Sequence, residues 1–456
     1  MAVSRQTLAE LRFGCGFRPD RPAPAGPEDL LRQIAAPPRG ALVDEAEARR
    51  RYAIQDGFIA LRRRAKQGDA DAARRFEQTL AEGRRMTRDD ALARLARAAT
   101  TPDGFVERLH RFWCGHFAVA RRNPRHGAFI LPMQELAIRP HLTGRFADML
   151  IAATKSPAML FYLDQSVSAG PNSRMARRNP RRGLNENLAR EILELHTLGV
   201  HGPYDQRDVR EFARLLAGWS HDAGGFRFRE NMAEPGEKTV LGRRWRGLGP
   251  EGAEEALRML ADHPATARRL AFKMARHFVS DAPPAPLVDA MARAYAGAPG
   301  GDLGAMTRAM IAHELAWTDR ARLGPAAKVK KPWDLVVSTL RAAGARKAEL
   351  APGGPFGPPL TIRALEAMGQ PIDRVPGPDG WKEDAEAWIT PGGLAARLDW
   401  AGRIGRVIAA RTDPRDFARV ALRDALGRET AFAVSAAGER WEAVALLLVS
   451  PDFNRR

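Results

Sequence analysis

Cysteine is nearly absent from this chain, and several familiar sequence signals are missing altogether. The 456 residues include only two cysteines, Cys15 and Cys114, too few for a disulfide framework or a four-thiolate metal site. A metal ion would therefore need carboxylate and imidazole ligands. No stretch approaches the roughly 18–20 apolar residues that a membrane-spanning helix requires, and residues 1–20 lack the pattern of a secretory signal. We therefore expect a cytoplasmic protein with two free thiols.

Signatures of well-known catalytic and nucleotide-binding sites are missing as well. The chain has no Gly-x-Ser-x-Gly nucleophile elbow, no Gly-x-x-x-x-Gly-Lys-Ser/Thr phosphate loop and no dinucleotide fingerprint after a predicted strand. Helix-turn-helix, zinc-finger and RNA-binding signatures are absent too, so nothing focuses the net charge of +18 on a nucleic acid. Most basic residues are arginines scattered along the chain, and their field favours an acidic partner or a polyanion.

Helical periodicity dominates what the chain does contain. Apolar residues recur at i, i+3, i+4 and i+7 along most of the sequence, as over residues 105–117, and the alternation typical of long sheets is rare. Asp205 is placed to cap a helix that runs to Leu216, with Asp208 at its third position. These patterns predict a mainly α fold.

We predict a large helical single-body fold with one small β-hairpin near residues 225–242. Apolar and polar residues alternate on either side of the turn-forming residues 234–237, which is typical of a hairpin. A chain of this length can build one large core or two coupled ones. We expect an N-terminal helical region over 1–98 and a helical core over 99–456 that carries the motifs, joined in one continuous domain.

The most informative stretch is a predicted polar helix over residues 183–199. At about 100° per residue, its polar side chains fall on one arc: Glu186, Asn187, Arg190, Glu191 and Glu194. Asn187, Glu191 and Glu194 follow i, i+4, i+7 spacing, so they can converge on a cation or a proton-transfer partner. An ordinary solvated face is the alternative, because Glu186, Arg190 and Glu194 form two successive pairs of opposite charge.

A basic loop over residues 171–182 precedes this helix. Its guanidinium groups are those of Arg174, Arg177, Arg178, Arg181 and Arg182. Beside a helix N-terminus, where Asn185 also lies, they would form an anion-binding site. A disordered basic loop is the alternative.

His116 lies on the apolar side of the helix predicted over 105–117, which is typical of a hydrogen-bonded core histidine. If that helix packs against the polar helix, His116 would face Glu191 and Glu194 in an interior able to hold a metal ion. The Glu-x-x-His pair of di-iron bundles is missing, so the metal and any cofactor stay open.

Two clusters also bring tryptophans together with polar groups, over 330–333 and around Trp381 and Trp388. Aromatic faces combined with hydrogen-bonding groups are used to hold sugars. We favour the simpler interpretation that these tryptophans pack into the core.

These motifs resemble a bacterial family known as domain of unknown function number eighteen hundred. The resemblance covers nearly the whole chain, including residues 12–19, 112–117, 185–199, 204–219, 238–242, 330–333, 368–371 and 378–381. It implies a mostly helical protein, often encoded beside a second family that looks similar to alkaline phosphatases, and many relatives carry export signals. This chain departs from the family pattern at Gly115, where the family has Asn, and at Ala233, where a histidine is frequent.

Two functions follow from these observations. In the first, the protein is an enzyme of hydrolytic or metal-assisted chemistry on an anionic substrate. Glu191 or Glu194 would act as base or ligand, Asn187 and Arg190 would orient the anion, and His116 would shuttle a proton. The alternative is a non-catalytic binding or assembly module, whose polar face is a salt-bridge network and whose basic surface docks an acidic partner such as the alkaline-phosphatase-like companion.

Overall fold

Helices build almost the whole structure, as predicted. In the computed structural model, 64% of the chain is helical and the strands form only two small antiparallel sheets. The structure describes residues 3–22, 26–36, 40–54, 57–179, 181–319 and 323–456. Within these ranges, no helix combines the length and the apolar character needed to cross a membrane.

Local chemistry sets several helix boundaries. Helix α12 (Gln206–Leu216) begins at Asp205, whose carboxylate accepts hydrogen bonds from the backbone N–H groups of Arg207 and Asp208 at 2.8 and 2.9 Å. The carboxylate of Asp208 accepts in return from the N–H of Asp205 at 3.2 Å. This reciprocal capping box is the one expected from the sequence.

The periodic stretch over 253–279 forms two helices instead of one. Helix α13 (Glu251–Asp262) ends before His263, and α14 (Pro264–Phe278) begins with the proline in its first turn. Proline has no N–H to donate and favours the first position of a helix, so Pro264 separates the two.

The four strands are paired differently from the prediction. They are β1 (Trp219–Asp222), β2 (Gly225–Phe228), β3 (Lys238–Val240) and β4 (Arg243–Trp245). Strands over 225–229 and 238–241 are present, but the prediction that they pair with each other is wrong, because β1 pairs with β2 and β3 with β4. Leu241 and Gly242 have φ angles of 48° and 76°. Such values suit the tight turn of a two-residue hairpin, which closes β3 onto β4.

Two hydrophobic cores organise the body. The first is formed by side chains between Leu8 and Trp317, including those of α6 (Gly104–His116) and α14. The second joins α18 (Pro332–Ala342) and the C-terminal helices to the end of α5 (Ala70–Thr100). The N-terminal residues contribute to both cores, since Phe13 lies in the first and Phe17 in the second.

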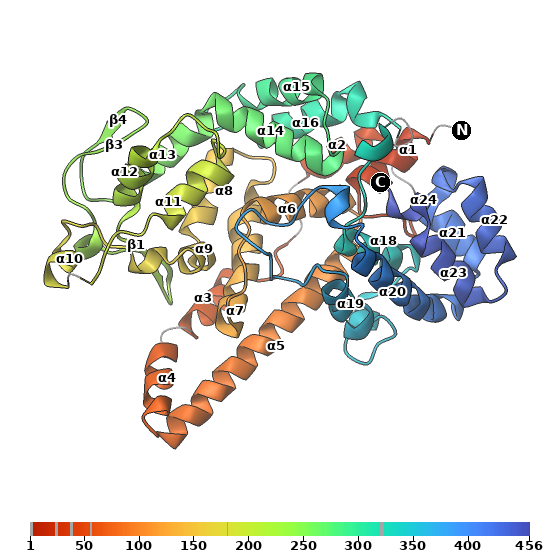
Figure 1. Ribbon diagram of the computed structural model, residues 1–456, viewed down its shortest axis with the longest axis horizontal. Coiled ribbons are helices and arrows are strands. Elements are labelled where there is room, and N and C mark those ends of the chain that lie inside the picture. The colour runs from red at the N-terminus through yellow and green to blue at the C-terminus, as the bar shows by residue number, and fades with distance from the viewer. Residues whose placement is uncertain (1–2, 23–25, 37–39, 55–56, 180, 320–322) are drawn as a thin grey trace.

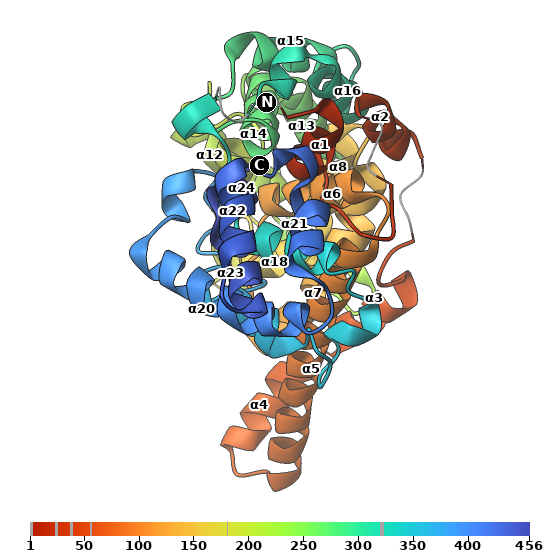
Figure 2. The same ribbon diagram turned by 90° about the vertical axis from the view of Figure 1, so that its right-hand side faces the viewer.

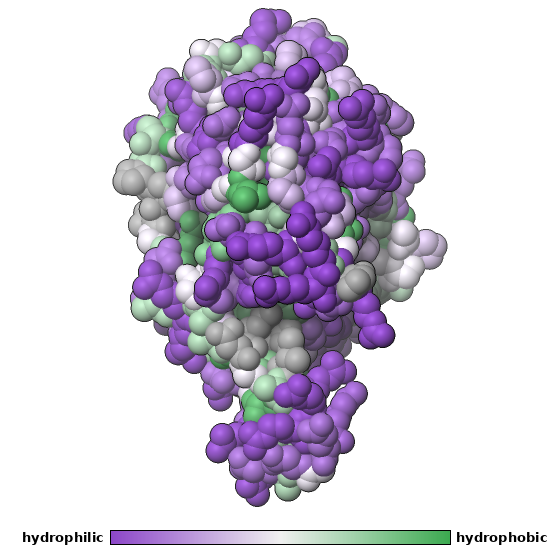
Figure 3. All heavy atoms as spheres, turned by 90° about the vertical axis from the view of Figure 1, so that its left-hand side faces the viewer, coloured by the Kyte–Doolittle hydropathy of each residue, from purple (hydrophilic) through white to green (hydrophobic). Residues whose placement is uncertain are grey.

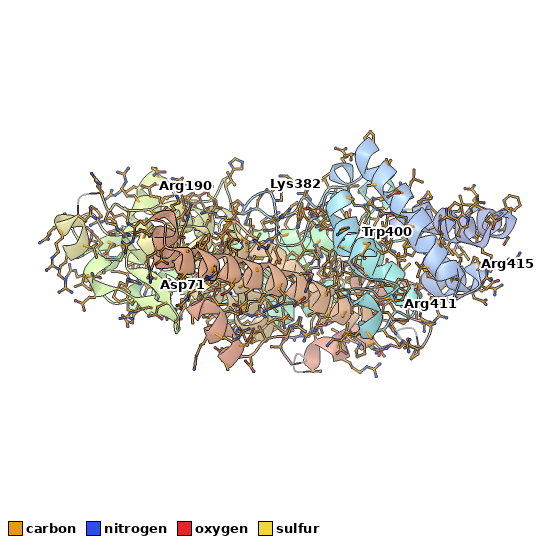
Figure 4. All side chains as sticks on the ribbon, turned by 90° about the horizontal axis from the view of Figure 1, so that it is seen from below. Asp71, Arg190, Lys382, Trp400, Arg411 and Arg415 are labelled. Carbon is orange, nitrogen blue, oxygen red and sulfur yellow. The ribbon has the colours of Figure 1, made fainter. Side chains whose placement is uncertain are left out.

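Helix α5 has 31 residues, and its N-terminal part extends well beyond the body as an arm. Helix α4 (Phe58–Lys66) packs along its outer part, and both views show the pair standing away from the other helices (Figures 1 and 2). Seen from below, Asp71 marks the outer part of this arm, while Trp400 lies among the C-terminal helices (Figure 4).

The other α-helices are α1 (Arg5–Leu8), α2 (Pro27–Ala35), α3 (Glu45–Ala53), α7 (Pro124–Pro132), α8 (Phe146–Lys155), α9 (Pro157–Tyr162), α10 (Arg174–Arg178), α11 (Asn187–Glu191), α15 (Ala285–Tyr295), α16 (Leu303–Ala312), α19 (Ile362–Ala367), α20 (Pro391–Ala409), α21 (Pro414–Leu422), α22 (Arg428–Ala436), α23 (Arg440–Val449) and α24 (Pro451–Asn454).

Candidate functional site

A polar cleft of about 370 Å³ lies between segments of the two cores. Helices α6 and α14 of the first core line it, together with the start of α18 and the loop over residues 370–384 from the second part of the chain. This volume falls within the range of clefts that hold small molecules. The cleft is therefore the candidate functional site.

Helix α14 supplies the central row of side chains. Arg269, Lys273 and His277 are spaced i, i+4, i+8, so they lie on one face of the helix, and all three line the cleft. Leu270 and Met274, which lie between them in the sequence, are fully buried in the first core. The amphipathic pattern of α14 thus points its basic row toward the cleft.

The glycine at position 380 lets the 370–384 loop approach α6 closely. Gly380 has a φ of 80°, a conformation that favours glycine. A Cβ atom on Gly380 would lie 2.6 Å from the carbonyl oxygen of Gly115. This close approach places Trp381 and Glu383 of the loop in the wall of the cleft, opposite residues of α6 such as His116.

The buried His116 forms a hydrogen-bonded pair with the partly buried Lys273. Nε2 of His116 lies 3.1 Å from the carbonyl oxygen of His196, which can only accept, so Nε2 carries the ring proton. Nδ1 is therefore the acceptor for Nζ of Lys273 at 3.0 Å. Burial and the charge of Lys273 hold the pKa of His116 well below its usual range, so the ring is neutral.

His277 is held by a carboxylate. Its Nδ1 lies 2.8 Å from Oε1 of Glu383, so Nδ1 carries the proton and Nε2 keeps its lone pair. Nε2 has no hydrogen-bond partner in the part of the chain that the structure describes. Glu383 also accepts from Lys331 at 2.7 Å and Lys328 at 3.2 Å. Although burial opposes it, these cationic neighbours and His277 hold the pKa of Glu383 well below its ordinary value.

The cleft carries an excess of positive charge. Each of its five carboxylates has a basic partner: Asp334 with Arg108, Asp373 with Arg94, Asp379 with Lys382, Glu383 with Lys331, and Asp384 with Arg276. Of the eight lysines and arginines in the lining, Arg111, Arg269 and Lys273 remain without a carboxylate at ion-pair distance among the described residues. The guanidinium carbon of Arg111 lies 3.8 Å from the ring centroid of Trp333.

Burial perturbs two of these three unpaired bases strongly. It lowers the pKa of Lys273 from 10.5 to about 7, with a further contribution from the charge of Arg269. It also lowers the pKa of Arg111 to about 10. A lysine that titrates near neutral pH in a cleft is typical of sites that transfer protons or form covalent intermediates.

The predicted polar helix forms a surface ion-pair network beside this site. It begins at α11 and continues as one wider turn over Ile192–His196. Glu186 accepts from Arg190 at 3.2 Å and from Gln206 at 2.8 Å, and Arg190 lies 3.5 Å from Glu194. Arg190 and Lys382 lie on the same long edge of the molecule (Figure 4).

The sequence-predicted residues therefore separate into two groups. His116 lines the cleft, whereas Asn187, Arg190, Glu191 and Glu194 are absent from its described lining. Burial, Glu194 and Asp379 nevertheless raise the pKa of Glu191 to about 7. Since Asp379 belongs to the cleft wall, Glu191 is electrostatically coupled to the edge of the site.

The basic loop before the polar helix lies at the surface. Arg174 pairs with Glu230 at 2.8 Å. The other four arginines are exposed and have no ion pair among the described residues: Arg177, Arg178, Arg181 and Arg182. Pro180 lies outside the described residues. The side chain of Asn185 is held by the fold, because its amide donates a hydrogen bond to the carbonyl oxygen of Leu163 at 3.0 Å. The face that carries α10 is largely hydrophilic (Figure 3).

No group of three or more His, Cys, Asp or Glu side chains in the described ranges is arranged to hold a metal ion. The sequence predicts His116, Glu191 and Glu194 as the ligands if a metal is bound. In the structure, the two ring nitrogens of His116 contact Lys273 and the backbone of His196.

Sequence reasoning missed Lys273, His277 and Glu383. The first two carried a usable signal, because α14 has a row of basic residues at i, i+4, i+8 with no acidic residue within the helix to pair with it. Glu383 carried no comparable signal, since it lies in a loop and meets His277 only through the fold.

The fold and the cleft together define a mainly helical protein with a basic, small-molecule-sized site. The chain belongs to the family described as "Protein of unknown function (DUF1800)", whose model matches residues 9–455. The resemblance stated from the motifs is thereby confirmed. Neither the curated proteins nor the solved structures contain a match to the chain.

Proposed function

We propose that this protein is an enzyme that binds a small anionic substrate in the cleft and acts on it by acid–base chemistry. The single observation that carries the proposal is the set of three basic side chains, Arg111, Arg269 and Lys273, left without carboxylate partners where all five carboxylates of the lining are paired. Unpaired cations in a partly enclosed site favour the entry of an anion.

Arg111 and Arg269 are suited to hold the anion. Arg111 is stacked on Trp333, which orients its planar guanidinium while leaving N–H donors for a ligand. Arg269 donates to the carbonyl oxygen of Leu195 through Nε and Nη2 at 3.4 and 3.3 Å. This contact fixes the side chain, so less entropy is lost when a ligand binds.

Two side chains are suited to transfer protons. Lys273 exchanges a proton near neutral pH because its pKa is about 7. His277 has a protonated Nδ1 anchored by Glu383 and an Nε2 lone pair without a partner among the described residues. This orientation of an imidazole by a carboxylate is the arrangement that general bases use.

Titration calorimetry with inorganic phosphate tests the proposal. At pH 7.5, in two buffers of different ionisation enthalpy, the protein should bind phosphate and take up a proton, because a bound anion favours the charged form of Lys273. Arg111→Gln should weaken binding roughly tenfold or more, as expected for loss of a charge-assisted contact. The matched control, Arg62→Gln on the exposed arm, should not. Absence of binding, or equal binding by both variants, would overturn the proposal.

The residues of the polar helix enter this proposal at the edge of the site. Glu191, with a pKa near 7, would act as a second acid–base group if substrate reaches it, with Glu194 beside it. Asn187 and Arg190 would orient the anion there. If Glu191→Gln leaves both phosphate binding and turnover unchanged, this part of the proposal fails while the cleft is unaffected.

Docking of an acidic partner is a second candidate, favoured by the exposed arginines of the basic loop. Arg177, Arg178, Arg181 and Arg182 present uncompensated charge near α10, and such surfaces steer association in a salt-dependent way. Replacing these four with glutamate should weaken binding to an alkaline-phosphatase-like companion at low salt. Unchanged binding would reject this candidate.

A further inference from the structure

Lys273 differs from the other lysines of the cleft in what it contacts. Lys331 pairs with Glu383 at 2.7 Å and Lys382 with Asp379 at 3.3 Å. Lys273 instead donates to the neutral ring of His116 and has no carboxylate at ion-pair distance in the described ranges. A lysine that only holds an anion gains from staying charged, so this environment suits a different task.

The contact with His116 also orients the amine. Because Nδ1 of His116 has no proton, a neutral Lys273 must direct one of its N–H groups at it. The lone pair of Lys273 then points away from the imidazole and remains unused. Lysines whose charge is suppressed by burial and by a cationic neighbour are the ones that act as amine nucleophiles toward carbonyl groups.

From this geometry we propose that Lys273 forms an imine with its substrate, and that the substrate is a small carboxylic acid that also bears an aldehyde or ketone. The inference rests on the proposed function, since Arg111 and Arg269 would hold the carboxylate. The carbonyl carbon would then meet the lone pair of Lys273 within the same cleft.

The chemical step balances without a further reactant. The lone pair of the amine forms the C–N bond while the carbonyl π pair moves to oxygen, and one proton passes from nitrogen to that oxygen to give a carbinolamine. The C–O bond then breaks, and the oxygen leaves as water after taking one more proton from solvent. Nitrogen keeps one proton in the resulting iminium ion.

His277 lies one helical turn beyond Lys273 on the same face of α14. Its Nε2 carries a lone pair and its Nδ1 is fixed by Glu383. It therefore provides a base beside the iminium ion, which draws electrons from neighbouring carbon atoms and makes their protons easier to remove. His116 would act as a positioning residue, since it orients the amine without contacting substrate.

Borohydride trapping tests the inference on the full-length protein. The protein is incubated at pH 7.5 with pyruvate or with succinic semialdehyde, reduced with sodium borohydride, digested and mapped by mass spectrometry. We expect the reduced adduct on Lys273 and little on Lys331 or on the exposed Lys66. Acetate, which has the carboxylate but no aldehyde or ketone, should leave no adduct and should slow trapping when present in excess.

The adduct is mapped on the wild-type protein, so this result does not depend on whether any variant folds. His116→Asn should reduce the trapping rate at Lys273 at least tenfold while circular dichroism stays unchanged. Absence of an adduct with either probe, or an adduct spread evenly over the lysines, would overturn the inference. If the protein still binds phosphate and takes up a proton in that case, the proposed function stands and only the proposal of an imine is rejected.

Discussion

Replacing Lys273 with methionine should stabilise the protein at pH 6 and lose that effect at alkaline pH. The pKa of Lys273 falls from 10.5 in the unfolded chain to about 7 in the fold. Between these values the unfolded chain binds more protons than the folded one, so the stability of the wild type rises with pH across this window. Below pH 7 the fold carries the full cost of a half-buried ammonium group, which methionine removes.

The magnitude follows from the same pKa shift. Each pKa unit corresponds to about 1.4 kcal/mol, so a fall from 10.5 to about 7 is worth at most about 5 kcal/mol. Because Lys273 is only partly buried, solvent screening reduces this to roughly 2–3 kcal/mol at pH 6 and to below about 1 kcal/mol at pH 9.5. Methionine also leaves Nδ1 of His116 without its donor, which costs about 1 kcal/mol at every pH.

Thermal unfolding at the two pH values measures the effect. For a chain of this length a change of 1 kcal/mol shifts the Tm by roughly 1 °C. The Tm difference between Lys273→Met and the wild type should therefore decrease by roughly 2 °C from pH 6 to pH 9.5. Lys66→Met on the exposed arm is the control and should show no such change. A Lys273→Met difference that is independent of pH would refute the reasoning.

Three further changes probe the walls of the cleft and its edge. Glu383→Gln should destabilise the protein by roughly 3–5 kcal/mol, because it leaves buried basic groups uncompensated. The folded pKa of Glu383 is depressed, so the difference in unfolding free energy between variant and wild type should shrink as the pH falls below the ordinary value of 4.5. A difference in urea unfolding that stays constant with pH would contradict this. Gly380→Ala should weaken phosphate binding in calorimetry, because its Cβ would lie 2.6 Å from the Gly115 oxygen and displace the loop. The control Gly392→Ala should bind phosphate like the wild type, because its Cβ meets nothing within 4 Å. Equal affinities of the two variants would count against the role of the loop. Glu191→Gln should raise the Tm at pH 8 but not at pH 4, because burial raises the pKa of Glu191 to about 7 and the fold pays for its ionisation only at the higher pH. A Tm difference that is independent of pH would contradict this.

Features that depend on neighbouring residues were predictable from the sequence. The cap at Asp205 and the helical pattern of α6 follow from side chains within one or two turns. The pairing of the strands did not follow, because the same alternating segments can close through different turns, and the shorter turn at Leu241 and Gly242 prevails.

The sequence predicted a helical region over 1–98 but not a single helix as long as α5 within it. The outer part of α5 projects from the body, whereas its middle packs against α7. The stripe that is buried there includes Gly83, Thr87 and Asp90, so large apolar residues do not mark it in the sequence. The charged residues of α5 resemble those of a loop. Helix propensity alone is a weak guide in such a stretch.

The candidate site was predicted only in part, because it joins segments distant in sequence. His116 was identified from its place on an apolar helix face, but its partner Lys273 lies 157 residues away. Core packing was the favoured prediction for Trp333 and Trp381, with a ligand contact as the second possibility. Trp333 is buried in the second core, and both side chains also line the cleft. Which basic groups stay unpaired depends on every carboxylate in the fold, so the excess charge could not be deduced from α14 alone.

The central claim is that Lys273 carries a neutral, reactive amine in an anion-binding cleft. Trace acetylation of the intact protein with acetic anhydride, followed by mass spectrometric mapping over pH 5–11, measures this directly. We expect labelling of Lys273 to reach half its maximum near pH 7, as its pKa implies, and inorganic phosphate to shift this midpoint upward. A midpoint for Lys273 that coincides with that of the exposed Lys66, or one that phosphate does not move, would contradict the account.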